Sequence, residues 1–186
     1  MFESNRYTVR RKILSFLGAT FEVFDADGNV VLYAKQKAFK LKEEMKFYTS
    51  SDMKDEVLSI KARNIFDISA TYDIKDSSSD GVIGAVRRKG IHSILRDEWT
   101  VLDNKDNEVG TMVEDSMGLA LIRRFVMNLI PQNYDYFIAG EKVADLKQQF
   151  NPFVYKLDID ILSEGVDKRM VLASAVLLSL VEGRQE

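Results

Sequence analysis

Hydrophobic and polar residues alternate along most of this chain, which is the pattern of a β-strand with one buried face. The alternation is clearest over Phe66–Lys75 and over Phe153–Leu162. We predict strands in both segments, with the apolar residues on the core face and the polar residues outside. In the second strand this places Phe153, Tyr155 and Leu157 in the core.

Weaker alternation predicts nine further short strands, for a total of about eleven or twelve. Their ranges are Tyr7–Leu14, Thr20–Asp25, Val30–Lys37, Val57–Arg63, Val82–Lys89, Glu98–Asp103, Glu108–Glu114, Tyr134–Ala139 and Lys142–Gln148. Turn-forming segments join them in series, namely Asp25–Asn29, Ser77–Gly81, Asp103–Asn107 and Ala139–Glu141. Sequential hairpins indicate a mainly β, antiparallel meander, and closing it into a barrel removes its exposed edges.

One segment near the end of the chain has no polar face at all. From Met170 to Val181 every residue is apolar or small, Asp167 is suited to cap a helix start, and Gly183 is suited to follow its end. A helix that is apolar all round must be buried. The run has 12 residues, whereas crossing a bilayer takes about 20. We therefore predict a central helix, at about 167–182, inside the barrel.

A second helix is predicted over Met117–Ile130, where Arg123, Arg124 and Asn128 have helical spacing and Pro131 stops the helix. Its polar positions make it a peripheral helix rather than a core helix.

Composition limits the classes of function. The 186 residues, 46% hydrophobic and 30% charged, predict one domain spanning residues 1–186. The formal charge of −3 gives no global attraction to nucleic acid or anionic lipid, so no nucleic-acid partner is expected and lipid binding needs a local basic patch. The chain has no cysteine, which excludes disulfides and thiolate chemistry. The start of the sequence lacks a signal-peptide pattern, so we expect a cytoplasmic protein without a transmembrane segment.

Several motifs resemble one family. Phe24–Phe39 resembles the opening hairpin of LURP-one-related and scramblase-like proteins, and Val86–Gly90 with Leu95–Trp99 resembles their middle section. Asn151–Phe153 and the apolar helix are similar to their C-terminal ends. The resemblance covers about Tyr7–Gln185 and implies a Tubby C-terminal-like domain, a closed barrel threaded by a helix.

The resemblance also implies expectations about ligands. Tubby domains bind phosphoinositide headgroups through cationic side chains on the outer face of the barrel. Scramblase-like proteins are associated with phospholipid and calcium, and LURP-one-related proteins with plant defence. This chain departs from the scramblase pattern, because it has neither a cysteine-rich acylation stretch nor a proline-rich N-terminal extension.

Two pairs of cations are the candidate phosphate ligands. Arg87 and Lys89 share one strand face, with Arg88 on the other, and Lys35 and Lys37 form a similar pair beside the first hairpin. Each pair either clamps a phosphate group or is part of a solvated exterior that protects the strand from aggregation. If the two strands lie close, all four cations converge on one phosphate.

The predicted peripheral helix offers a candidate membrane surface. Arg123 and Arg124 would meet headgroups while Leu121, Phe125 and Leu129 dip into the interface. The alternative is that this apolar stripe packs onto one end of the barrel.

No catalytic or metal-binding residue is expected. The Asp25–Asn29 loop lacks the sixth-position glycine and twelfth-position glutamate of an EF-hand, because Val30 and Gln36 stand there. Asp158 and Asp160 alternate with core residues and face solvent, unlike an acid–base pair.

His92 is the only histidine, and no nucleophile elbow or glycine-rich phosphate loop accompanies it. Trp99 is interpreted as a large core or rim anchor. We therefore expect a non-enzymatic binding module without a cofactor, cytoplasmic or peripheral to the membrane, with anionic phospholipid as its ligand. The alternative is a protein-interaction or stress-response module, and an enzyme of unrecognised type comes third.

Overall fold

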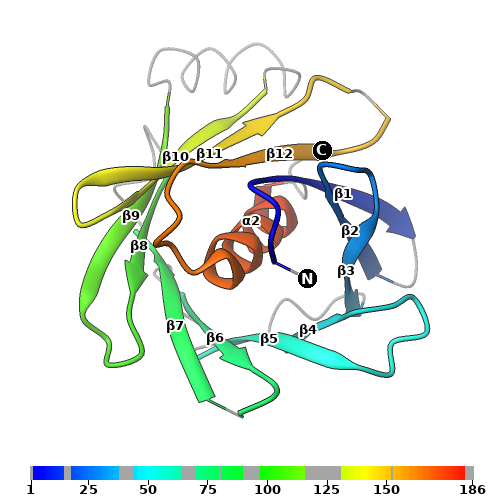
Figure 1. Ribbon diagram of the computed structural model, residues 1–186, viewed down its shortest axis with the longest axis horizontal. Helices are drawn as coiled ribbons and strands as arrows, with labels where there is room; N and C mark the ends of the chain where they lie inside the picture. The colour runs from blue at the N-terminus through cyan, green and yellow to red at the C-terminus, as the bar shows by residue number, and fades with distance from the viewer. Residues whose placement is uncertain are drawn as a thin grey trace.

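The computed structural model describes residues 2–14, 18–37, 44–63, 70–79, 81–89, 97–115, 131–151 and 153–182. Within these ranges twelve strands surround one helix (Figure 1). The strands are β1 Arg6–Leu14, β2 Gly18–Asp25, β3 Val30–Lys37, β4 Met45–Tyr48, β5 Glu56–Ala62, β6 Thr71–Asp76, β7 Gly81–Arg88, β8 Glu98–Leu102, β9 Glu108–Glu114, β10 Asn133–Ile138, β11 Glu141–Gln148 and β12 Lys156–Ile161.

The strands form a closed antiparallel barrel in which each strand pairs with its neighbours in sequence. Closure joins the two ends of the meander, with Arg6 of β1 opposite Asp160 of β12. A closed barrel leaves no sheet edge open to pairing with another chain. The predicted mainly β barrel is therefore confirmed.

One strand was missed by the sequence prediction. β4 has only four residues, of which Met45 and Phe47 are buried and face the core. Two core positions are too few to establish a period of two, so the alternation carries no clear signal there. β6 begins at Thr71, and residues 66–69 of the predicted Phe66–Lys75 strand lie outside the described residues.

The prediction that Phe153 faces the core is wrong. β12 begins at Lys156, and the Phe153 side chain is 89% exposed. The Asn151 side-chain oxygen accepts hydrogen bonds from the backbone N–H groups of Phe153 (2.9 Å) and Val154 (3.0 Å). These bonds turn the backbone before the strand starts, so the alternation does not extend back to Phe153.

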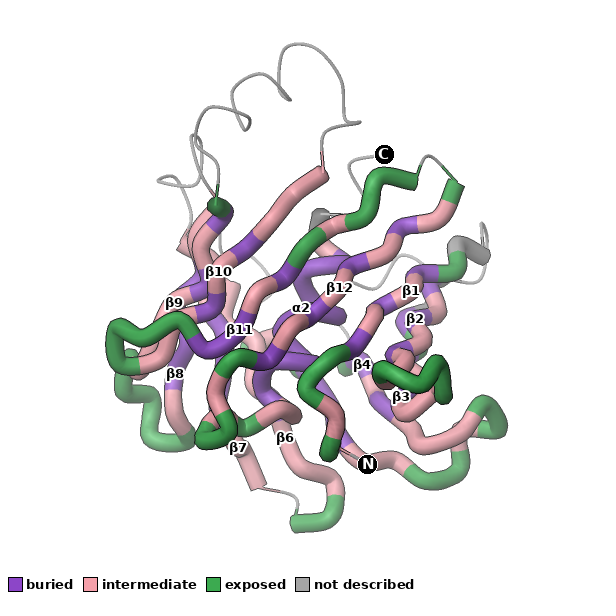
Figure 2. Tube along the Cα trace, turned by 45° about the horizontal axis from the view of Figure 1, so that its top comes forward, coloured by how far each residue is buried: buried purple, intermediate pink, exposed green. Residues whose placement is uncertain are grey.

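The central helix is confirmed as α2, Lys168–Glu182. It runs through the middle of the barrel (Figure 1), and its positions 170–180 are all buried. Figure 2 shows that buried and partly exposed positions alternate along the strands, so one face of each strand points to this helix. Ser174 and Ser179 are fully buried on this helix, and their hydroxyls donate to the carbonyls of Met170 (2.7 Å) and Ala175 (2.8 Å). Their polar atoms are thus satisfied within the helix.

The start of α2 is fixed to the barrel at two places, the end of β6 and the segment before β1. The Asp167 carboxylate accepts from the backbone N–H of Arg169 (2.9 Å), as predicted for a cap. Arg169 forms an ion pair with Asp76 at the end of β6. Lys168 Nζ donates to the carbonyls of Glu3 (3.0 Å) and Ser4 (2.9 Å), just before β1.

Two hairpin turns share one local design. In the β2–β3 turn, Asp25 Oδ1 accepts from the backbone N–H groups of Asp27 (3.0 Å) and Asn29 (2.8 Å). Asp103 repeats this arrangement in the β8–β9 turn with Asn107. Hydrogen bonds from Asn29 lower the pKa of Asp25, and those from the side chain and backbone of Asn107 lower the pKa of Asp103. These carboxylates are turn formers.

The lowered pKa values predict acid sensitivity. A carboxylate whose pKa is lower in the folded state stabilises the fold above its unfolded pKa of about 3.9, and this stabilisation is lost as the pH falls through the folded value. At pH 7 we therefore expect Asp103→Asn to melt at a lower temperature than the wild type. The difference should shrink as the pH falls from about 4 to 3, as followed by circular dichroism melts. A difference that stays constant over this range would contradict the assignment.

Candidate ligand-binding surfaces

The first candidate pair lies on β7, and each of its cations already has an acidic partner. Arg87 forms an ion pair with Glu108, and Lys89 pairs with Glu98 at 2.6 Å. Arg88 points to the other side, where its guanidinium lies 2.9 Å from Asp97 and 5.7 Å from the ring centre of the buried Trp99. The positive charge of this segment is therefore balanced, and Trp99 is a core anchor.

The second candidate pair lies on β3, far from the first. Lys35 is exposed on the outer face, and the Lys37 side chain lies outside the described part of the chain. Strands β4, β5 and β6 separate β3 from β7 in the barrel. At about 4.8 Å per strand spacing this separation is roughly 19 Å along the sheet. The two pairs thus do not converge on one phosphate.

The remaining sequence candidates are either half-buried positions on β12 or residues outside the described ranges. Asp160 pairs with Arg6 at 3.3 Å, and Asp158 accepts from the Thr8 hydroxyl (2.8 Å) and from Gln149. Both aspartates therefore have neutral or cationic partners on the outer face. Arg123, Arg124 and the predicted helix Met117–Ile130, together with His92, lie outside the described residues.

A cluster that the sequence analysis did not find lies on the outer face where the barrel closes. It consists of Arg10 and Lys12 on β1, Lys35 on β3 and Lys156 on β12, and we call it the cationic patch. Arg10 lies opposite Lys156 in the β1–β12 pairing. Thr20 of β2 lies opposite both Lys12 and Lys35.

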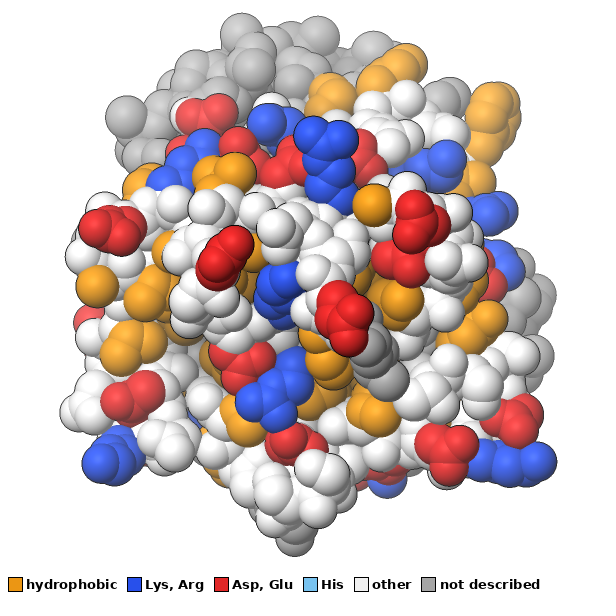
Figure 3. Space-filling view, in the orientation of Figure 1, with side chains coloured by type: hydrophobic (Ala, Val, Ile, Leu, Met, Phe, Trp, Pro, Cys, Tyr) orange, Lys and Arg blue, Asp and Glu red, His pale blue; other side chains and the backbone are white. Residues whose placement is uncertain are grey.

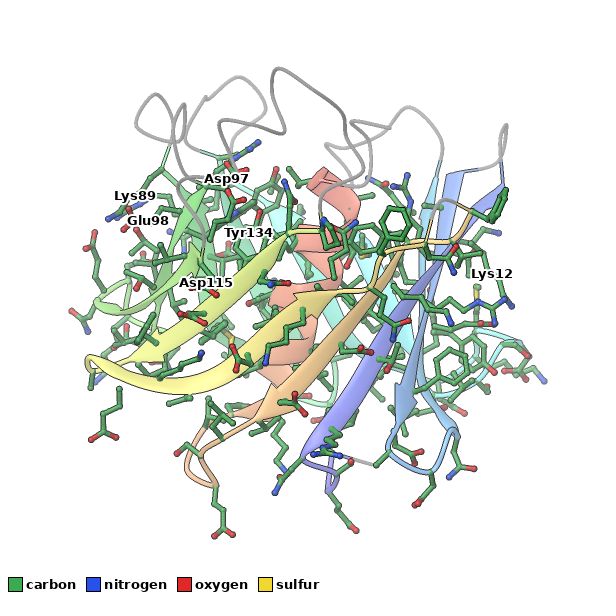
Figure 4. All side chains as sticks on the ribbon, turned by 90° about the horizontal axis from the view of Figure 1, so that it is seen from above. Lys12, Lys89, Asp97, Glu98, Asp115 and Tyr134 are labelled. Carbon is green, nitrogen blue, oxygen red and sulfur yellow. The ribbon has the colours of Figure 1, made fainter. Side chains whose placement is uncertain are left out.

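One carboxylate lies within the cationic patch. Glu22 is opposite Arg10 on β2 and forms an ion pair with Lys12. Arg10, Lys35 and Lys156 make no ion pair with any residue in the described ranges. The cationic patch therefore holds four cations and one acidic side chain. It lies on the opposite side of the barrel from the β7 pair, as the positions of Lys12 and Lys89 show in Figure 4.

On the outer face further along β10–β12 the acidic side chains are balanced by ion pairs. Asp135, Asp145 and Asp160 lie directly opposite one another on three adjacent strands. Lys142 bridges two of them, at 2.7 Å from Asp135 and 2.7 Å from Asp145, and these hydrogen bonds raise its pKa. Lys147 lies 3.2 Å from Asp145, and Arg6 pairs with Asp160, so this row is neutral overall. Elsewhere the charges are mixed, as on the end of the barrel seen in Figure 3.

A few polar side chains face the interior near the end of the barrel where β9 and β3 finish. They are Glu114, Gln36 and Arg11, with exposed fractions of 2%, 4% and 9%. Each lies at a strand position whose side chain points to the core. The Glu114 carboxylate accepts from the backbone N–H of Asp97 at 3.4 Å. These residues could have been found from the sequence, because each occupies a strand position at which the alternation predicts an apolar side chain.

The described residues contain no group of three or more His, Cys, Asp or Glu side chains that could hold a metal ion. In the same ranges no helix is long and apolar enough to cross a membrane. The interior of the barrel is filled by α2 and its core contacts, and the cationic patch lies on the outer face.

Such a helix-filled antiparallel barrel defines the class of protein, and the comparisons supply the family. The family model described as LURP-one-related matches residues 5–179. The chain therefore belongs to the LURP-one-related family, as its motifs predicted. The barrel of this family is generally non-catalytic.

A solved structure shows the same fold. The X-ray structure of a protein from Arabidopsis thaliana matches with a TM-score of 0.53, covering 97% of this chain and 93% of that chain at 10% sequence identity. Comparison with curated proteins gave no match to this chain.

Proposed function

We propose that this barrel is a non-enzymatic module that binds anionic phospholipid surfaces through the cationic patch. The carrying observation is the local excess of positive charge: Arg10, Lys35 and Lys156 have no acidic partner among the described residues, although the whole chain has a formal charge of −3. The proposal places the protein in the cytoplasm, in reversible contact with the anionic leaflet of the membrane.

The shape of the cationic patch favours an extended surface over a single phosphate group. From Lys156 on β12 to Lys35 on β3 there are three strand spacings, or roughly 14 Å. Cations spread over this width match several headgroups better than one small anion. The cationic patch spans β12 and β1–β3, so its binding would orient this side of the barrel toward the membrane.

The β7 pair contributes less in this proposal. A phosphate bound by Arg87 and Lys89 would have to displace Glu108 and Glu98, which already accept from these cations. The displaced carboxylates would then repel the incoming phosphate.

The proposal predicts that Lys35→Glu with Lys156→Glu weakens binding to phosphatidylserine vesicles strongly. A cation near an anionic surface contributes about 1 kcal/mol, so losing two weakens binding about 30-fold, and reversing their charge weakens it further. Vesicle sedimentation at low salt measures this effect. The matched control is Arg87→Glu with Lys89→Glu, which changes the net charge by the same amount at the site whose cations are paired.

The control variant should retain most of the binding. If both double variants lose affinity equally, the net charge of the protein matters and the cationic patch is not the site. If the wild type does not sediment with anionic vesicles even at low salt, the lipid proposal is wrong and a protein partner becomes the leading alternative.

A further inference from the structure

The loop between β11 and β12 carries two exposed aromatic side chains. Phe150 is 65% exposed and Phe153 is 89% exposed, whereas Phe21 and Phe47 are fully buried. Among the described residues only Leu162, 55% exposed, is a comparable large hydrophobic side chain at the surface. In Figure 3 hydrophobic side chains protrude at the upper right edge, where Figure 1 draws this loop.

Backbone hydrogen bonds hold this loop in place. Its base is closed by Gln149, whose N–H donates to the carbonyl of Lys156 at 3.0 Å and whose side chain donates to Asp158 at 2.8 Å. Its tip is turned by Asn151, which accepts from the backbone N–H of Phe153. The exposure of the two phenylalanines is therefore a property of an ordered turn, and their apolar surface costs free energy in water.

The loop is adjacent to the cationic patch. Lys156, the first residue of β12, belongs to the patch and directly follows the loop. The Arg11 N–H donates to the carbonyl of Tyr155 at 3.0 Å, which extends the β1–β12 pairing by one step toward the loop. Exposed aromatic side chains and the cations of the patch thus lie at the same end of the barrel.

We infer that Phe150 and Phe153 insert into the acyl boundary of an anionic bilayer while the cationic patch contacts its headgroups. This inference rests on the proposed lipid function and assigns the element that makes the attachment partly hydrophobic. Apolar side chains flanked by cations are the combination by which peripheral proteins bind the membrane interface.

The size of the exposed surface favours a bilayer over a protein partner. A phenylalanine side chain buries about 150–250 Å² when fully covered, so the exposed parts of these two give roughly 300 Å². A stable protein interface buries about 800 Å² on each partner, with a shape-complementary centre. A bilayer needs no complementary shape, so two inserted side chains suffice.

A spectroscopic experiment tests insertion directly. In Phe153→Trp the new indole is exposed, whereas the single native tryptophan, Trp99, is fully buried and gives a constant background. With phosphatidylserine vesicles at low salt we expect a blue shift of the emission and quenching by lipids brominated on the acyl chain. The wild-type protein measured in parallel supplies the Trp99 signal to subtract. Sedimentation of the wild type with no blue shift in Phe153→Trp would overturn the inference and leave the lipid proposal intact.

A salt series tests the energetic contribution. Salt screens the cationic patch but leaves hydrophobic insertion in place. We expect Phe150→Ser with Phe153→Ser to sediment at low salt and to lose the binding that the wild type retains at high salt, by about tenfold or more. The control is Leu162→Ser, which removes an exposed hydrophobic side chain at the far end of β12. Equal salt curves for wild type and double variant would contradict insertion, whereas no binding by the wild type at any salt would instead contradict the proposed function.

Discussion

Replacing Leu177 with aspartate should prevent the barrel from folding. Leu177 lies on α2, is 2% exposed and belongs to the central core. The substitution loses the burial of a leucine, worth about 2–5 kcal/mol, and adds the cost of a buried carboxylate without a partner. Together these terms match or exceed the total stability of about 5–15 kcal/mol that a typical domain has.

Soluble yield and the cooperativity of a circular dichroism melt measure this effect. Leu162→Asp is the matched control, because it makes the same chemical change at a side chain that is 55% exposed. The control should fold and melt near the wild-type temperature. A soluble Leu177→Asp protein with a normal cooperative melt would refute the role of α2 as the core of the barrel.

Gly110→Ala should lower the melting temperature by about 2–12 °C. A Cβ atom at Gly110 would lie 2.0 Å from the carbonyl oxygen of Phe137 and 2.8 Å from Ile138 Cδ1. Gly110 pairs with Ile138 across β9 and β10, so the obstructing backbone cannot move away without disturbing the ladder. Overpacking of this kind costs about 1–3 kcal/mol, and each kcal/mol lowers the melting temperature of a protein of this size by about 2–4 °C.

Gly165→Ala is the control for Gly110→Ala. Its nearest neighbour is Ser163 Oγ at 4.0 Å, so an added methyl group has room. Any Gly→Ala substitution lowers the conformational entropy of the unfolded chain. Comparing thermal melts of the two variants with the wild type separates this effect from the steric crowding at Gly110. Equal melting temperatures for the three proteins would show that β9 and β10 can relax around the added atom.

Secondary structure was largely predictable because each element carries its own signal. Positions 156–161 alternate and 170–181 have no polar face, so burial alone specified a strand and a central helix there. Two core residues were too few to reveal β4. Phe153 continued the alternation, but the side chain of Asn151 fixes the backbone in a turn, and turn chemistry overrides an apolar residue at the end of a pattern.

The candidate surfaces were less predictable because they depend on register between distant segments. The sequence showed Arg87 and Lys89 as a basic cluster, but their partners Glu108 and Glu98 come from other strands of the barrel. Arg10 and Lys156 are far apart in the chain and meet only because β1 pairs with β12. No local pattern contains that pairing, so the cationic patch could be found only in three dimensions.

The position of α2 in the chain order also constrains how this protein is made. All twelve strands precede the helix that fills them, and the first strand pairs with the last. While the chain emerges from the ribosome, the strands therefore have neither their core nor their closing partner, and their apolar faces must remain without a native contact until residues near 180 are synthesised. Closure of the barrel is thus expected to wait until α2 has been synthesised, and to be slow because its contacts are non-local.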